Sequence, residues 1–244
     1  MQTLKEKTIG EYVAEDFRTA AIFKKNKIDF CCRGNRSLEE VCEKKGIDIT
    51  KISQELEATL QKSGDSTIDF NAWPLDLLAD YVEKTHHRYV EEKTGIILQF
   101  LEKLCQVHGK NHPELFEINQ IFTSVAQGLA AHMKKEELIL FPFIRKMVQA
   151  SRKNEGLPEA KFGSVENPID MMEHEHTEEG DKLVRIAELT NDYQMPADGC
   201  NTYRVTFAML EEFEQDLHKH IHLENNILFP KSILLEKSLA TNLN

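Results

Sequence analysis

The sequence is poor in residues that interrupt helices and in residues that cross-link chains. Its 244 residues include 11 glycines, 7 prolines and 5 cysteines. The cysteines are Cys31, Cys32, Cys42, Cys105 and Cys200. Because their number is odd and their spacing irregular, a disulfide framework is not expected. Free thiols are typical of the reducing cytoplasm, where we expect to find the protein.

Long apolar runs and positive charge are lacking as well. No apolar run approaches the roughly 18 residues that a membrane span requires. The opening residues, MQTLKEKT, lack the apolar core of a signal peptide. A net charge of -11 repels nucleic acid and anionic membranes, because binding to phosphate groups requires a basic patch. We therefore expect a cytoplasmic protein that binds neither nucleic acid nor membrane.

The first part of the chain predicts a small helical domain over residues 1–62. Expected helices cover 8–27, 37–46 and 50–62, and a polar linker follows at 63–72. Between the first two helices, the segment DFCCRG leads to a turn at Gly34. Ser37 and Glu40 have the spacing of a capping box, which begins the second helix, and Gly46 ends it.

Four long helical segments are expected after the linker. They cover 74–107, 113–150, 167–189 and 201–240. Together they predict an all-α fold in which residues 73–244 form an up-down four-helix bundle. Pro142 and Pro230 fall late in the second and fourth segments. Because proline cannot donate a helical hydrogen bond, we expect these two prolines to kink or end the segments.

An internal repeat marks the second and fourth segments. His132 and Glu136 form an H-x-x-x-E pattern that is followed, after four further residues, by a Phe-Pro pair. His220 and Glu224 repeat the pattern with the same trailing pair. Each pattern is preceded, at nearly the same distance, by two closely spaced histidines in the segment before it. The chain is therefore expected to contain one helical hairpin twice.

The spacing of this repeat predicts a metal centre in the bundle core. Residues four apart lie on one helix face, so each pattern directs an imidazole and a carboxylate to one point. A single pattern is usually a solvent-exposed pair, whereas two patterns, each with a partner histidine, are far more specific. Four imidazoles and two carboxylates suit two transition-metal ions, and favour iron or manganese over metals that prefer thiolates.

Neighbouring residues indicate which histidines face inward. His176 begins an apolar stripe and His174 a charged one, so we expect His176 to face the core. His220 lies on the apolar stripe of the fourth segment. The stripe of His132 is expected to continue to Ile139.

The other histidines are less informative. His218 and His222 flank the stripe of the fourth segment. His108 is expected to be a helix C-terminal cation, because a rise of about 1.5 Å per residue puts it roughly 30 Å from His87. The pair His86-His87 stays open at this point, since the apolar pattern accommodates either residue and slightly favours His86.

The bundle pattern resembles the hemerythrin-like di-iron domain. Combined with Asp29-Phe-Cys31-Cys32-Arg-Gly34, it resembles the RIC family (Repair of Iron Centres, ScdA type) over essentially the whole chain. The resemblance implies two non-haem irons, bridged by an oxo group and by carboxylates. The ligands it implies are His87, His132, Glu136, His176, His220 and Glu224. It thus selects His87 where the apolar pattern does not decide.

The resemblance also implies a function. Members of the family repair iron-sulfur clusters that nitric oxide or oxidants have damaged, which we expect to proceed by iron donation. The expected partners are damaged iron-sulfur proteins, a diatomic ligand (NO or O2) and a second copy of the chain in a homodimer. Two alternatives use the same centre: an enzyme that reduces nitric oxide, and an oxygen or redox sensor.

One departure bears on these alternatives. Oxygen-carrying hemerythrins have a further histidine one turn after the third-helix ligand, and here that position is Gly180. The glycine argues against an oxygen carrier and predicts an open coordination position. Alternatively, it only allows helices to approach closely.

Cys31 and Cys32 are candidate transfer thiols. Arg33 and Arg36 follow them closely, and nearby cations stabilise a reactive thiolate. Adjacent cysteines do not readily form a disulfide with each other, because disulfides prefer wider Cα separations. We expect these thiols to pass iron or electrons between the bundle and a client protein. The alternative is that both are small buried apolar residues.

Overall fold

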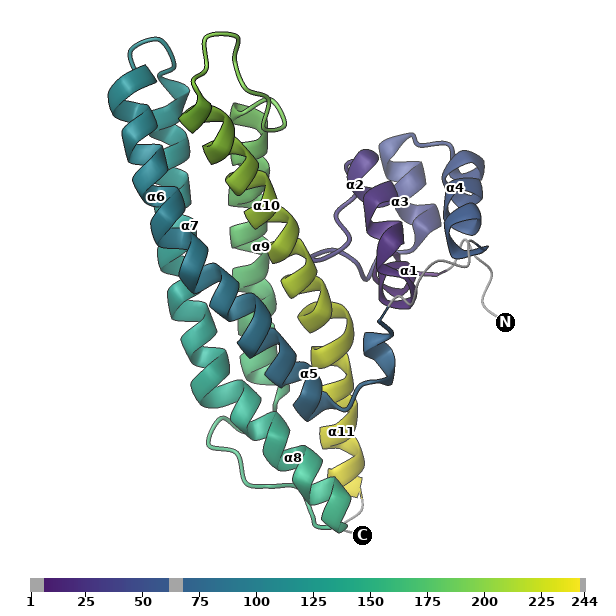
Figure 1. Ribbon diagram of the computed structural model, residues 1–244. Coiled ribbons are helices and arrows are strands. Elements are labelled where there is room, and N and C mark those ends of the chain that lie inside the picture. Colours follow the sequence, from purple (N-terminus) through teal and green to yellow (C-terminus); the bar gives the residue numbers. More distant parts are fainter. Residues whose placement is uncertain (1–6, 62–67, 242–244) are drawn as a thin grey trace.

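A computed structural model describes residues 7–61 and 68–241. In these residues the secondary structure is helical and no β-strand is present, so the all-α fold class is confirmed. The molecule consists of a long helical bundle with a small helical domain packed on one side of it (Figure 1). Among the described residues, no helix combines the length and the apolar character that a membrane crossing requires.

The small domain contains short helices, and its longest connection, residues 26–37, contains the cysteine pair. The helices are α1 (Ile9–Glu15), the 3-10 helix η1 (Phe17–Thr19), α2 (Ala20–Lys25), α3 (Leu38–Lys45) and α4 (Ile49–Gln61). The single helix expected over 8–27 is wrong, because Asp16 is extended (φ -151°) and caps η1 by accepting a hydrogen bond from Arg18 N. As expected, the Ser37 side chain caps α3 and Gly46 ends it with a φ of 65°.

The bundle consists of four long segments. The first contains α5 (Leu75–Tyr81), the π-helix η3 (Val82–His87) and α6 (Arg88–His108). The third is a single helix, α9 (Glu166–Leu189). The second contains α7 (Glu114–Lys135), the π-helix η4 (Glu136–Leu140) and α8 (Phe141–Lys153). The fourth contains α10 (Asn201–Leu223), the π-helix η5 (Glu224–Leu228) and α11 (Phe229–Thr241). Helix α6 packs against α7 and α10, and α9 packs against the same two helices, which closes the expected up-down bundle (Figure 1).

The prolines of the repeat do not end their segments. Pro142 and Pro230 each follow a π-helical turn, η4 or η5, and the chain stays helical beyond them. Proline lacks an N–H group, and its ring clashes with the carbonyl four residues earlier in an α-helix. The wider π turn ends just before the Phe-Pro pair, so each proline lies in the first turn of a new α-helix, where no donor is missed.

The π turn also changes the helix register. Ile139, which the helical pattern places in the core, is 50% exposed, whereas Leu140 is 1% exposed. A π turn contains one residue more than an α-helical turn. The inward position therefore shifts from Ile139 to Leu140.

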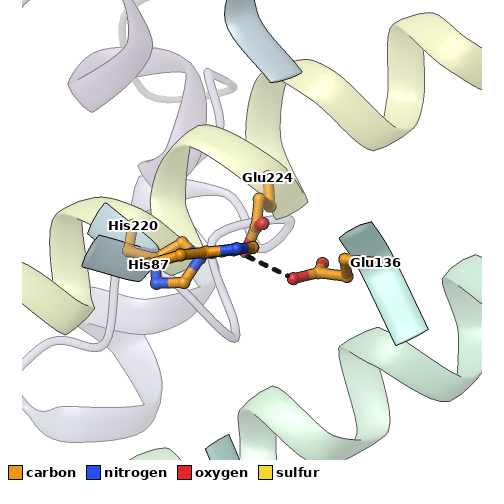
Figure 2. A group of neighbouring side chains, drawn as sticks. All are labelled: His87, Glu136, His220 and Glu224. Carbon is orange, nitrogen blue, oxygen red and sulfur yellow. Dashed lines mark ion pairs between the residues drawn. The ribbon is translucent and has the colours of Figure 1, made fainter. Parts of the chain in front are cut away.

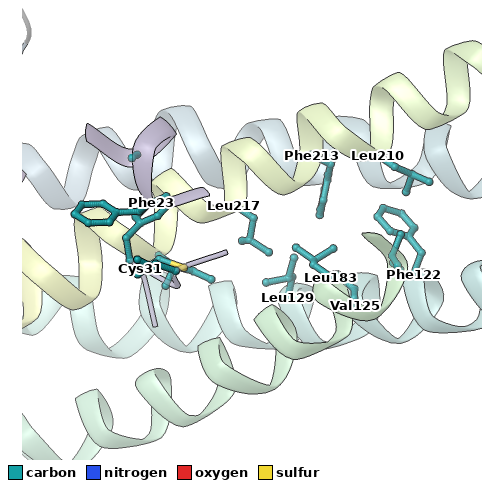
Figure 3. Packing of buried hydrophobic residues seen from close by; sticks show 14 of the residues in the cluster. Phe23, Cys31, Phe122, Val125, Leu129, Leu183, Leu210, Phe213 and Leu217 are labelled. Carbon is teal, nitrogen blue, oxygen red and sulfur yellow. The ribbon is translucent and has the colours of Figure 1, made fainter. Parts of the chain in front are cut away.

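Two apolar clusters fill the bundle, one on each side of the predicted metal ligands. The first joins the small domain to the bundle: Phe23 and Cys31 belong to the same cluster as Leu129, Leu183 and Leu217 (Figure 3). The second gathers residues of α5, α8, α11 and the start of α9. The small domain therefore shares a core with the bundle.

Part of the expected linker at 63–72 is packed. Residues 62–67 lie outside the described part of the chain. Beyond them, Phe70 is buried, with its ring centroid 4.9 Å from that of Trp73 and 5.2 Å from that of Tyr81. The Asn71 side chain donates a hydrogen bond of 2.9 Å to Ala14 O in the small domain. The end of this range thus connects the two parts of the molecule.

Candidate metal centre

The six predicted ligands meet in the middle of the bundle. His87 comes from η3, His132 and Glu136 from α7 and η4, His176 from α9, and His220 and Glu224 from α10 and η5. None of the six is more than 2% exposed. Figure 2 shows four of them converging from the first, second and fourth segments. All three π-helical turns of the described chain carry predicted ligands, and π turns are frequent at functional sites.

Each glutamate lies between two histidines. Glu136 Oε2 is 3.3 Å from the Nε2 atoms of His87 and His132, and Glu224 Oε2 is 3.3 Å from His176 Nε2 and 3.2 Å from His220 Nε2. The ligand atoms form two groups of four, and both groups contain both glutamates. His87 and His220 complete one group, and His132 and His176 complete the other. Two positions that share two carboxylates suit a pair of neighbouring cations.

Several polar atoms of the site lack a hydrogen-bond partner among the described residues. Both carboxylate oxygens of Glu136 and Glu224 and both ring nitrogens of His220 are buried without a hydrogen-bond partner among the described residues. Leaving such groups buried and unpaired is costly. His132 Nε2 and His176 Nε2 are 2.9 Å apart. That is the separation of two nitrogens bound to one ion at right angles with bonds of about 2.0–2.1 Å. The residues present therefore fit metal cations.

Electrostatics keeps the two glutamates ionised. Burial raises the pKa of the Glu224 carboxyl, but His220 and His176 lower it further, to well below its ordinary value. The pKa of Glu136 is also lowered: burial and Glu224 raise it, and His132 and His87 outweigh them. Both side chains are thus anionic at neutral pH.

Three of the histidines are oriented by a residue from the next segment. The pairs are His87 Nδ1 with Glu137 Oε1 at 3.1 Å, His132 Nδ1 with Glu175 Oε2 at 2.9 Å, and His176 Nδ1 with Asn225 Oδ1 at 2.8 Å. Such contacts fix the ring and leave Nε2 free for a metal. Sequence reasoning missed Glu137, Glu175 and Asn225. Each is adjacent in the sequence to a predicted ligand, and this adjacency could have identified them.

His86 breaks this pattern. Like those three residues, His86 is the chain neighbour of a predicted ligand, His87. Its ring, however, stacks on that of His220, with centroids 5.6 Å apart and an interplanar angle of 11°. Its Nδ1 pairs with Asp216 Oδ1 at 3.0 Å. Both His86 and His87 are buried because they lie in the π turn η3, where the helical period does not hold. Of the two, His87 belongs to a ligand group and His86 does not.

The other histidines lie outside the ligand groups. His174 is exposed. His218 and His222 face the small domain, with ring centroids 5.8 and 6.1 Å from that of Phe30. Burial lowers the pKa of His222 to about 3, so it is neutral. His108, the last residue of α6, lies at the far end of the bundle with its Nε2 3.2 Å from Cys200 Sγ.

The cysteine pair lies directly beside a predicted ligand. Cys32 Sγ donates a hydrogen bond of 3.4 Å to His176 O, and its distance to Cys31 Sγ is 3.7 Å. The side chain amide of Asn225 donates a hydrogen bond of 3.3 Å to Cys31 O. The small domain thus reaches the backbone and the orienting residue of one ligand.

The expectation that arginines activate both thiols is wrong for Cys31. The Arg33 guanidinium lies 3.7 Å from Asp181 and Arg36 donates to Arg33 O, so neither is directed at Cys31. The hydrogen bond with Cys32, together with burial, raises the pKa of the Cys31 thiol well above its ordinary value. Cys31 therefore holds its proton at neutral pH.

Gly180 faces the cysteine segment. A Cβ atom placed there would lie 3.2 Å from Cys32 Sγ, which is tighter than ordinary van der Waals contact. The glycine thus allows Cys32 to lie against α9. The open coordination position inferred from Gly180 stays a prediction.

Comparison with known proteins agrees with this arrangement. A model described as the hemerythrin HHE cation binding domain matches residues 78–232, and one described as a domain of unknown function (ScdA_N, DUF542) matches residues 5–60. Fold and site together thus define a cation-binding helical bundle of the hemerythrin class with an added small domain.

Relatives of similar length narrow the class further. The chain is 36% identical over 230 residues to the iron-sulfur cluster repair protein YtfE of Musicola paradisiaca, covering 94% of this chain and 97% of the relative. It is 29% identical over 229 residues to the iron-sulfur cluster repair protein ScdA of Staphylococcus haemolyticus, covering 93% and 97%. The chain belongs to this family of iron-sulfur cluster repair proteins.

Proposed function

We propose that this protein holds two non-haem irons and repairs iron-sulfur clusters damaged by nitric oxide or oxidants, by donating iron to them. His87 and His220 would bind one iron and His132 and His176 the other, with Glu136 and Glu224 shared between the two. Iron held by imidazole and carboxylate ligands can change its oxidation state and bind a diatomic ligand such as nitric oxide at a free position.

The observation that carries this proposal is the position of Cys32 beside His176. Its Sγ lies 3.4 Å from His176 O, so a thiol of the small domain and a predicted iron ligand are in direct contact. Thiolates are the ligands that iron has in clusters. The cysteine segment is therefore well placed to carry iron between the bundle and a damaged iron-sulfur protein.

Both ligand groups contain both glutamates, and this sharing favours donation of iron over permanent storage of iron. Each carboxylate serves both ligand groups, so protonating or displacing one of them weakens both positions together. A centre built in this way can lose iron in response to a change at a single side chain.

The test is the recovery of a damaged iron-sulfur enzyme. An aconitase-type enzyme inactivated with nitric oxide is incubated anaerobically with the iron-loaded protein, and its activity is followed. The intact protein should restore activity, and the Cys31→Ala/Cys32→Ala double variant should keep its iron yet restore little. Equal recovery with both proteins would show that the thiols take no part. Nitrous oxide formation without recovery would identify a nitric oxide reductase instead.

A further inference from the structure

Asp29, Cys31 and Cys32 form a second group of ligand atoms, separate from the six of the bundle. Asp29 Oδ1 accepts hydrogen bonds of 3.0 Å from the main-chain N atoms of both cysteines. The same oxygen lies 3.4 Å from Cys31 Sγ, and the two Sγ atoms are 3.7 Å apart. One carboxylate oxygen and two sulfurs thus lie within 4.8 Å of one another.

These separations are those of a tetrahedral metal site. Two thiolates bound to one ion at about 2.3 Å in tetrahedral geometry lie about 3.8 Å apart. An oxygen bound at about 2.0–2.2 Å lies about 3.5–3.7 Å from either sulfur in the same geometry. The observed distances of 3.7 Å between the sulfurs and 3.4 Å from Asp29 Oδ1 to Cys31 Sγ are close to these values.

The bundle holds this group in place. Asn225 and Asn226 donate hydrogen bonds of 3.3 and 3.2 Å to Cys31 O. On its other side, Cys32 Sγ is 3.4 Å from His176 O, so a main-chain carbonyl also lies at about the distance of a neighbouring ligand. Gly180 leaves the space that lets Cys32 reach this position. The ligand atoms are therefore fixed by both parts of the molecule.

We propose that Asp29, Cys31 and Cys32 bind one divalent cation that accepts tetrahedral thiolate and oxygen ligands, and that this cation is Fe²⁺ during cluster repair. Binding releases two thiol protons to solvent and transfers no electrons. The identity of the ion as iron cargo rests on the repair function proposed above, whereas the existence of the site does not. The site would give iron leaving the bundle a thiolate-coordinated position next to His176.

Cobalt provides the direct probe. The full-length protein, with its bundle loaded with iron, is titrated anaerobically with Co²⁺. We expect one Co²⁺ per chain, with a thiolate-to-cobalt charge-transfer band and the intense visible absorption of a tetrahedral site. Cobalt that replaced iron in the bundle would give no thiolate band, because no cysteine belongs to that centre.

Matched variants assign the signal to its ligands. Cys31→Ser/Cys32→Ser should abolish the thiolate band, and Asp29→Asn, which retains the oxygen that the backbone needs, should weaken Co²⁺ binding by about tenfold or more. Cys42→Ser and Cys200→Ser should change nothing. The proposal would be overturned by a thiolate band that persists in the Cys31→Ser/Cys32→Ser variant. Loss of the band in the Cys200→Ser variant would overturn it as well.

The outcome also separates this site from the repair function. If Co²⁺ binds as described and the cysteine variants still repair clusters, the metal site is supported and repair through the thiols is contradicted. If the cysteine variants fail in repair while the intact protein shows no thiolate band, the metal site is contradicted and the repair function is supported.

Discussion

The side chain of Asn225 joins His176 to the small domain. Its Oδ1 lies 2.8 Å from His176 Nδ1, and its Nδ2 donates to Cys31 O. Asn225→Ala should therefore weaken metal binding roughly 10- to 100-fold, as loss of an orienting contact does, and loosen the cysteine segment. Competition with a chelator measures the affinity. Asn226→Ala is the matched control: Asn226 donates to Cys31 O but contacts none of the six predicted ligands of the bundle, so the affinity of the bundle centre should hold. Equal losses in the two variants would contradict this role.

Glutamate and histidine variants should differ in how much metal they lose. Glu136→Ala and Glu224→Ala should each lose both ions, because both groups contain both glutamates. His220→Ala should mainly affect one ion. Metal analysis after anaerobic preparation gives the number of ions per chain. His174→Ala, at an exposed position, should keep the full content. A glutamate variant that keeps one firmly bound ion would show that the carboxylates are not shared.

The two neighbouring histidines of η3 should behave differently. His87→Ala removes a member of a ligand group and should cost metal, whereas His86→Ala removes a ring that stacks on His220 and should retain it. Loss of the buried stacked ring should still lower the stability of the protein by about 1–3 kcal/mol. Metal analysis and thermal unfolding of both variants provide the comparison. Greater metal loss from the His86 variant would reverse the assignment.

Gly180→Ala should displace Cys32 without removing metal. The added Cβ would lie 3.2 Å from Cys32 Sγ, so the thiol must move away from α9. We expect alkylation of Cys32 by iodoacetamide to become faster by about tenfold, since a displaced segment is more open to solvent. Peptide mass spectrometry follows the modification. Gly95→Ala is the control, because its Cβ would meet no atom within 4 Å. Unchanged reactivity in the Gly180 variant would mean that the segment does not pack closely there.

Cys200 should be the most reactive thiol near neutral pH. Hydrogen bonding from the backbone at Tyr203 and from His108 lowers its pKa to about 7, while burial raises the pKa of Cys42 and of Cys105. Because the thiolate is the reacting form, the alkylation rate should be half-maximal near pH 7 and fall as the pH is lowered. His108→Gln should move this midpoint upward. A midpoint near the ordinary thiol value in the intact protein would contradict the pairing.

Much of the site could be predicted from the sequence. A spacing of four residues between histidine and glutamate determines a shared helix face wherever the helix forms, and the repeated pattern predicts two such faces in one bundle. The six residues His87, His132, Glu136, His176, His220 and Glu224 could thus be named before any coordinates, with the family resemblance needed only for His87.

Other features depended on the tertiary structure. The π turns exchange Ile139 for Leu140 in the core and bury both His86 and His87, because an added residue breaks the period that sequence patterns assume. Likewise, Glu137, Glu175 and Asn225 each pair with a histidine on another segment, and no local sequence pattern indicates which helices are neighbours.

The sequence by itself determined which side chains share a helix face, because that depends only on local geometry. Only the tertiary structure decided that Cys32 lies 3.4 Å from His176 O, although the two residues are far apart in the chain. The physical reason is that this contact depends on how the small domain docks. The docking is set jointly by the shared apolar core, by the hydrogen bonds of Asn225 and Asn226, and by the space at Gly180.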